Sequence, residues 1–509
     1  MPSNFHGQSV RSSYENHIAP PMPSLALHSQ EKPAFQSGGS SIVFASLSPR
    51  EKGFFSGIEG SRLDRNSMQQ FYDCLATRDG KKIFKWMIDH NLQVQSRSGK
   101  GKLEWLNELP TPVMGSCENY LKTGEYDYFT DLKRQYKHYR SAASQGLYSL
   151  ASPGVGFANR ETDPPMLLFA VNGIHALGVG NPEDEAACDS QYKIDVSLGK
   201  LKSRIQQLKG EEQLEDDKLI KWDHPPFLFR LAQNFANGFF GHAKSFPDDA
   251  NFLFDQRRNL NKGVIKSAGY EIVRELLGID ENLQPTGSRR ILIDMQHLSA
   301  ASRNDLYEKI FRIYNKNIDP ANPIPVVFIG AAYSGIDYLI EMIKNAHEGL
   351  EYDDFRVNGY YGAGINLSDE DVLAVFWSQG LISLTLETRK LGEEMGGLEK
   401  MFSPSARSKA LRLLGRQLAG IISIPFAYHL SSPLRIWDSI SIGPGIGFES
   451  SVLEHYRSGV HIEHLKEDVE EVLMKIKKVE PMWFGGYKPC TLAEKICSGN
   501  MMALAARNY

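Results

Sequence analysis

The stretch ILIDMQHLSAAS, residues 291–302, opens with three large aliphatic side chains and turns polar at His297. Apolar residues that run on without the alternation of a half-exposed strand are typical of a parallel strand covered on both faces. We therefore expect a buried strand over 290–297. The histidine at its carboxyl end is a candidate for chemistry, because the reacting groups of α/β barrels lie at the carboxyl ends of strands.

Five further stretches have the same apolar character, and helical patterns lie between them. The expected strands cover 166–173, 226–233, 325–332, 381–387 and 439–445, and the expected helices cover 196–210, 267–278, 303–316 and 368–380. The last helix begins at Ser368 with Asp371 three positions on, which is the pattern of a helix N-cap. Strand and helix alternating at even intervals predict an α/β fold, a (β/α)8 TIM-like barrel, with a doubly wound open sheet as the alternative.

The first part of the chain differs in composition from the rest. It is rich in Ser, Pro, Gln and Gly up to about residue 42, with no helical or strand period. We expect residues 1–60 to form an extended, low-complexity tail without a core of its own, and residues 61–509 to form the barrel. A segment of this kind is ordered only when it is held against something, so the tail predicts a homo-oligomer or a protein partner.

The composition and charge of the chain disfavour several classes of function. The chain has 509 residues, of which 41% are hydrophobic, and 57 Lys and Arg against 61 Asp and Glu give a net charge of −4. No long basic run is present, which disfavours nucleic-acid binding, and the apolar runs are too short to predict a membrane span. Five cysteines without metal-binding spacing, and an N-terminus without a continuous apolar core, favour a cytoplasmic protein.

Several motifs in a fixed order carry a resemblance to a known family. They include VNGIHALG (171–178), LAQNFANGFFGHAKS (231–245), RRILIDMQHLSAASR (289–303) and WDSISIGPGIG (437–447). In this order they resemble the membrane dipeptidase family, which are zinc-dependent dipeptidases with an amidohydrolase-like barrel. The resemblance covers the chain from about residue 61 to its end, and it implies a metal site at the mouth of the barrel.

Most of the metal ligands that the resemblance implies are exchanged in this chain. The implied positions are Leu75, Thr77, Asn172, His175, Gln233, His297, Gly330 and Gly445. Asn172 stands where the family has a bridging glutamate, Gln233 and Gly330 stand where it has histidines, and Gly445 replaces an aspartate. His297 is the only retained ligand candidate. The chain is therefore expected to be a divergent member that lacks most of the family's ligands.

Coordination chemistry says what these exchanges cost. A catalytic zinc needs about three N, O or S ligands and an open position for water. Leucine and glycine supply no ligand atom, and asparagine supplies only a neutral oxygen. We therefore predict no metal or other cofactor and no catalytic residue, and a pseudo-hydrolase that serves as a binding or assembly module. Zinc and an active dipeptidase or amidohydrolase with a reduced metal site are the alternative.

The mouth of the expected barrel also permits two other interpretations. His297 could simply hydrogen-bond Asp294 or a backbone carbonyl, or His297 or His175 could serve acid–base chemistry in a different enzyme. The polar residues that could line a pocket there are Asn172, His175, Gln233, Asn234, His242, Glu387 and Arg389. His461 and His464 are spaced for one helix face, but their charged surroundings predict a solvated helix.

Overall fold

The structure is a computed structural model. It describes residues 42–47, isolated positions between 129 and 144, and residues 149–154, 166–177, 191–211, 222–232, 237–245, 259–265, 267–349, 356–392, 405–443, 453, 455 and 464–509.

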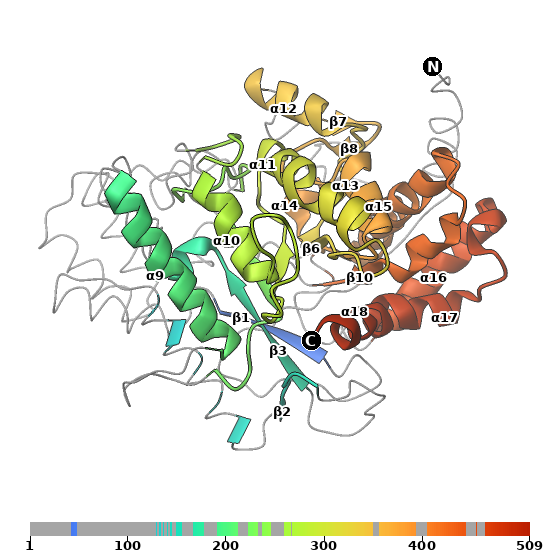
Figure 1. The fold of residues 1–509 in the computed structure, drawn as a ribbon. Helices are drawn as coiled ribbons and strands as arrows, with labels where there is room; N and C mark the ends of the chain where they lie inside the picture. Colours follow the sequence, from blue (N-terminus) through green and yellow to red (C-terminus); the bar gives the residue numbers. More distant parts are fainter. Residues whose placement is uncertain are drawn as a thin grey trace, which may run out of the picture.

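A parallel sheet forms the centre of the molecule (Figure 1). Its strands lie side by side in the order β1 (Ile42–Leu47), β3 (Met166–Asn172), β4 (Leu228–Arg230), β5 (Leu292–Asp294), β6 (Val327–Ala331), β9 (Leu381–Leu384) and β10 (Ile440–Ile442). The short strand β2 (Ser149–Leu150) also pairs in parallel with β3. A separate antiparallel pair is formed by β7 (Arg356–Val357) and β8 (Tyr360–Tyr361).

The strand order follows the chain and never reverses. A doubly wound sheet has a switch point where the order turns back, whereas a barrel is wound in one direction. The order therefore favours barrel-like winding over the open-sheet alternative. Among the described residues, no pairing joins β10 to β1, so what is seen is a half-barrel and the closed eight-stranded barrel remains a prediction.

Helices follow the strands, as the sequence predicts. The α-helices are α9 (Gln191–Lys209), α10 (Ser267–Leu277), α11 (Ala300–Leu306), α12 (Leu339–His347), α13 (Asp369–Trp377), α14 (Thr388–Leu391), α15 (Ala406–Ala427), α16 (Leu465–Val479), α17 (Pro489–Glu494) and α18 (Asn500–Asn508). Short 3-10 turns are η1 (Ile174–Leu177), η7 (Pro433–Asp438) and η11 (Pro481–Phe484), and π-turns are η4 (Tyr307–Phe311), η5 (Tyr314–Ile318) and η12 (Lys495–Gly499). None of the helices in the described ranges is long and apolar enough to span a lipid bilayer.

The predicted elements are confirmed with shifted ends. All six expected strands are present, each shorter than its apolar run, and the expected helix over 303–316 lies within a helical stretch interrupted by two π-turns. Ser368 caps α13, and a reciprocal bond to Asp371 completes a capping box. The segment 42–47 needs a correction: it lies in the expected tail but is strand β1, paired with β3 over six residues. The division at residue 60 otherwise remains a prediction.

Both faces of the sheet are covered. Phe169, Phe229, Ile293 and Phe328 belong to the large core that the strands share with the helices. Side chains of the opposite face, among them Leu168, Leu228 and Leu292, pack instead with residues of α18. Tyr509 donates to the carbonyl oxygens of Ala151 and Pro225, at the amino ends of β3 and β4. The C-terminal helix therefore closes the end of the sheet opposite to the strand carboxyl ends (Figure 1).

Candidate functional site

A buried ion pair joins the carboxyl ends of three neighbouring strands. Arg230 ends β4 and faces Asp294, which ends β5, in the register of the sheet. Arg230 Nε and Nη2 lie 2.7 and 2.6 Å from Asp294 Oδ2, and Nη2 also donates to the carbonyl oxygen of Ile329 in β6 at 2.8 Å. The other carboxylate oxygen accepts from the backbone N–H groups of Gln296 and Ile329, each at 3.0 Å. Both side chains are almost fully buried, so each charge is compensated within this network.

A second cation lies on the next part of the same edge. Strand β6 has a β-bulge at Gly330, whose φ of +77° is in the left-handed region that favours glycine. Lys390 Nζ donates to the carbonyl oxygen of Gly330 at 2.8 Å and lies 3.5 Å from Glu387 Oε2. Lys390 and Glu387 are both buried. The backbone conformation thus explains the glycine at position 330, and the carbonyl oxygen of Gly330 accepts a hydrogen bond from the ammonium group of Lys390.

His297 lies just past the end of β5, as expected, but in a backbone conformation that the sequence did not predict. Its φ is +71°, which is unusual for a residue with a side chain and is often found at functional sites. The ring is buried, and Nδ1 lies 2.8 Å from Ser245 Oγ. The expected contact with Asp294 is not found: the contacts of that carboxylate go to Arg230 and to backbone N–H groups.

His242 is beside His297. It forms an antiparallel bridge with Leu298, and the N–H of Ala243 donates to the carbonyl oxygen of His297 at 2.9 Å. The His242 ring is fully buried, and its Nδ1 lies 3.1 Å from the carbonyl oxygen of Ala243. A ring nitrogen beside a carbonyl oxygen carries the hydrogen. Nδ1 of His242 is therefore a donor.

The segment 361–367 crosses the carboxyl ends of three strands. Gln296 Nε2, after β5, donates to the carbonyl oxygen of Ile365 at 3.2 Å, and Asn366 Nδ2 donates to those of Tyr361 and Lys390 at 2.9 and 2.8 Å. These contacts fix both amide orientations. Among the described atoms, Gln296 Oε1 and Asn366 Oδ1 are buried and accept no hydrogen bond. Two buried acceptor oxygens thus lie near the carboxyl ends of the strands without a donor among the described atoms.

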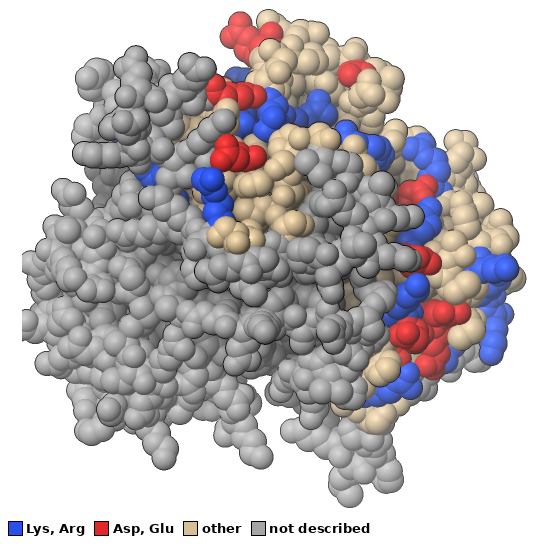
Figure 2. All heavy atoms as spheres, turned by 90° about the horizontal axis from the view of Figure 1, so that it is seen from below, with Lys and Arg blue, Asp and Glu red and all other residues tan. Residues whose placement is uncertain are grey.

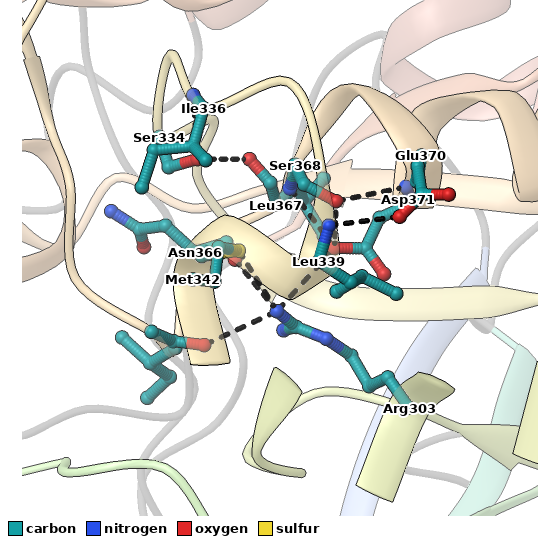
Figure 3. Close-up of polar contacts among 12 residues, drawn as sticks. Arg303, Ser334, Ile336, Leu339, Met342, Asn366, Leu367, Ser368, Glu370 and Asp371 are labelled. Carbon is teal, nitrogen blue, oxygen red and sulfur yellow. Dashed lines mark hydrogen bonds and ion pairs between the residues drawn. The ribbon is translucent and has the colours of Figure 1, made fainter. Parts of the chain in front are cut away.

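Arg303 binds the segment 361–367 through its backbone carbonyl groups (Figure 3). Arg303 of α11 is fully buried, and its Nη2 donates to the carbonyl oxygens of Gly364 and Asn366, each at 3.2 Å. The same nitrogen lies 3.4 Å from Asp371 Oδ2, and Tyr307 donates to Asp371 Oδ1 at 2.8 Å. Burial raises the pKa of Tyr307 well above its ordinary value, so its hydroxyl remains a donor. This cluster of Arg303, Asp371 and Tyr307 therefore holds the segment 361–367 in place.

The side chains that the structure describes at this edge do not fit a zinc centre. In the described part of the chain, no group of three His, Cys, Asp or Glu side chains is placed to hold a metal ion. The edge instead presents a guanidinium at Arg230 and an ammonium at Lys390, and the carboxylates of Asp294 and Glu387 face these cations. A divalent cation there would meet two fixed positive charges in a region of low dielectric.

Several predicted site residues fall outside what the structure describes. For Leu75, Thr77, Gln233, Asn234, Gly445 and His461 nothing is described, and for Asn172, His175 and Arg389 only the backbone is. His464 directly precedes α16 and is exposed. From the predicted set, the structure places His242 beside His297 and links Gly330 to Glu387 through Lys390. It adds Arg230, Ser245, Gln296, Asn366 and Lys390. Arg230, Ser245 and Gln296 stand in or beside the quoted motifs, but only the register of β4 and β5 reveals the pairing of Arg230 with Asp294.

Comparisons with known proteins give similar structures at low identity. No protein-family model matches this sequence, and no curated protein matches it. Dipeptidase AC, a metallopeptidase of family M19, is 14% identical with a TM-score of 0.40 over 75% of this chain and 78% of its own. A Rhodobacter sphaeroides metallopeptidase liganded with a phosphinate mimic of L-Ala-D-Ala is 15% identical, with a TM-score of 0.39 over 74% of both chains.

The probable dipeptidase PvdM from Pseudomonas aeruginosa is 12% identical, with a TM-score of 0.37 over 78% of this chain and 81% of its own. At this level of likeness the function must come from the site itself.

Proposed function

We propose that this chain is a divergent relative of the zinc dipeptidases that has lost their metal-dependent hydrolysis and serves as a binding or assembly module. One observation carries the proposal. The cationic head groups of Arg230 and Lys390 are fixed on the carbonyl oxygens of Ile329 and Gly330, at the edge where a metallohydrolase of this fold needs ligands.

The chemistry of the edge supports the loss of the metal reaction. In metallohydrolases the bound metal lowers the pKa of the attacking water toward neutrality, and the exchanged ligands would remove that metal from this edge. The carboxylates of Asp294 and Glu387 face internal cations, which compensate their charge. A metal-dependent alternative would need ligands from residues outside the described ranges.

The position of the edge and two unpartnered oxygens support a binding role. Ligands of α/β proteins bind outside the carboxyl ends of parallel strands, and near these ends Gln296 and Asn366 each have a buried acceptor oxygen without a donor among the described atoms. Basic and acidic side chains are interspersed on the part of the face in Figure 2 that the structure describes, in keeping with the net charge of −4. The proposal therefore places a small neutral ligand at the mouth and assigns assembly to the N-terminal residues 1–41.

Hydrolysis of a dipeptide tests the proposal. The full chain is incubated with L-Ala-D-Ala, the dipeptide whose mimic is bound in one of the similar structures, before and after chelation and after zinc is added back. We expect no zinc-dependent release of alanine in any condition. Hydrolysis that chelation abolishes and zinc restores would overturn the proposal in favour of the reduced metal site.

A further inference from the structure

We infer that Ser245 and His297 form a metal-independent acyl-transfer pair at the mouth, with Ser245 as the nucleophile and His297 as its general base. The substrate class is an ester or a similarly activated acyl compound. This inference goes beyond the proposed function, since it concerns a reaction that needs no metal.

The geometry of the pair is that of an activated serine. Ser245 Oγ and His297 Nδ1 are 2.8 Å apart, within the hydrogen-bond reach that proton abstraction requires. The carbonyl oxygen of Ala243 is a more distant acceptor for the same hydroxyl, at 3.4 Å. Of these two acceptors the imidazole nitrogen is the nearer, which is the arrangement that proton transfer from Ser245 to His297 requires. His297 is buried and Ser245 is only half-buried, so the nucleophile is the member that a substrate can reach.

The backbone holds the two residues together. The N–H of Ala243 donates to the carbonyl oxygen of His297 at 2.9 Å, and the N–H of Ser299 donates to that of Gly241 at 3.2 Å. This pairing needs glycine at 241, because a Cβ there would lie 1.8 Å from the carbonyl oxygen of Lys262. The left-handed backbone of His297 is thus maintained by pairing on the neighbouring segment. Such backbone strain at a functional side chain is kept only where the surroundings impose it.

A second serine–histidine contact in the molecule shows what an inert pair is like. Ser152 Oγ lies 2.8 Å from His224 Nδ1, but the same nitrogen lies 2.9 Å from the carbonyl oxygen of Ala151. A nitrogen that donates to a carbonyl carries the hydrogen and cannot take a proton from serine. This pair also lies next to β2 and before β4, at the amino ends of the strands. It is a matched control.

The reaction balances without any further reagent. Ser245 Oγ attacks the acyl carbonyl carbon and forms a C–O bond, while its proton passes to His297 Nδ1. The bond to the leaving alkoxide then breaks, and the imidazolium returns the proton to that oxygen. The products are the acyl-serine and the free alcohol, and water releases the acid by the same route.

A fluorophosphonate probe tests the inference on the full chain. It phosphonylates an activated serine and releases fluoride, and mass spectrometry of the digested protein locates the modified residue. We expect labelling at Ser245 that S245A abolishes and S152A leaves unchanged. H297N is the preferred base variant, because asparagine tolerates a left-handed backbone. It should slow labelling by about 100-fold or more, the usual contribution of a general base.

Three results would overturn the inference: no label on Ser245 in the unaltered chain, an unchanged labelling rate in H297N with a melting temperature close to that of the unaltered chain, or a rate that falls on chelation. The last would point back to the metal-dependent alternative. Failure of the proposed function would instead be seen as zinc-dependent dipeptide hydrolysis, with or without a labelled serine.

Discussion

Replacing Arg230 by methionine should destabilise the protein strongly. Arg230→Met keeps an unbranched side chain of similar length and removes the guanidinium that compensates the Asp294 carboxylate. Breaking one partner of a buried ion pair costs about 3–5 kcal/mol, because it leaves an uncompensated buried charge. Asp294 would keep its two backbone N–H donors at 3.0 Å, so we expect a loss near the lower end, about 3 kcal/mol.

The measurement is the free energy of unfolding from urea titration, in a double-mutant cycle with Asp294→Asn. The double variant removes both charges and keeps an acceptor oxygen for the N–H groups of Gln296 and Ile329, so it should recover most of the lost stability. Arg312→Met is the matched control: Arg312 and its partner Glu308 are about half exposed, so its loss should be under about 1 kcal/mol. The bridging role of Arg230 would be refuted if Arg230→Met lost no more stability than Arg312→Met. It would also be refuted if the stability losses of the two single variants simply added up in the double variant.

Three further predictions concern other parts of the molecule. Gly330→Ala should lower the free energy of unfolding by about 1–2 kcal/mol, because the φ of Gly330 is +77°. In the control, Gly199→Ala, the new Cβ meets open space and should stabilise helix α9 by about 0.5–1 kcal/mol. Equal effects of the two substitutions would contradict the bulge at Gly330. Burial raises the pKa of the Cys497 thiol to about 12, so the contribution of this thiol to stability is complete below pH 9 and is lost as the pH rises toward 12. With a thiol reagent at pH 8, Cys490→Ser should remove one fast-reacting thiol, and Cys497→Ser should remove none. Removal of residues 1–41, which spares β1, should lower the mass of the assembly in light scattering and leave the melting temperature unchanged; an unaltered mass would disprove the assembly role of the tail.

The sequence predicted the strands well because burial on both faces leaves a continuous apolar run. It overestimated their lengths, since the run continues where the ladder of hydrogen bonds ends, as at Leu228–Arg230 within 226–233. Strand β1 was missed although IVFASL is itself such a run, because the composition of the surrounding residues was given more weight. Tertiary pairing overrides composition at this position.

The candidate site was predicted only in part, for a physical reason. His297 and Gly330 could be found because each lies at the end of an apolar run. Arg230 and Asp294 are 64 residues apart in the sequence, and only the register of β4 and β5 makes them neighbours. Ser245 stood within a motif, but its contact with His297 depends on the backbone pairing of two loops. Gly330, interpreted as a lost ligand, also has a conformational cause in its positive φ.

The ratio of zinc to protein after equilibrium dialysis tests the central claim most directly. The full chain and His297→Asn are dialysed against buffered zinc, and the bound metal is measured by mass spectrometry. The fixed cations of Arg230 and Lys390 predict a ratio well below one that is the same in both proteins. A ratio near one or two in the unaltered chain that falls in His297→Asn would contradict the account, because it would show a metal centre built on that histidine.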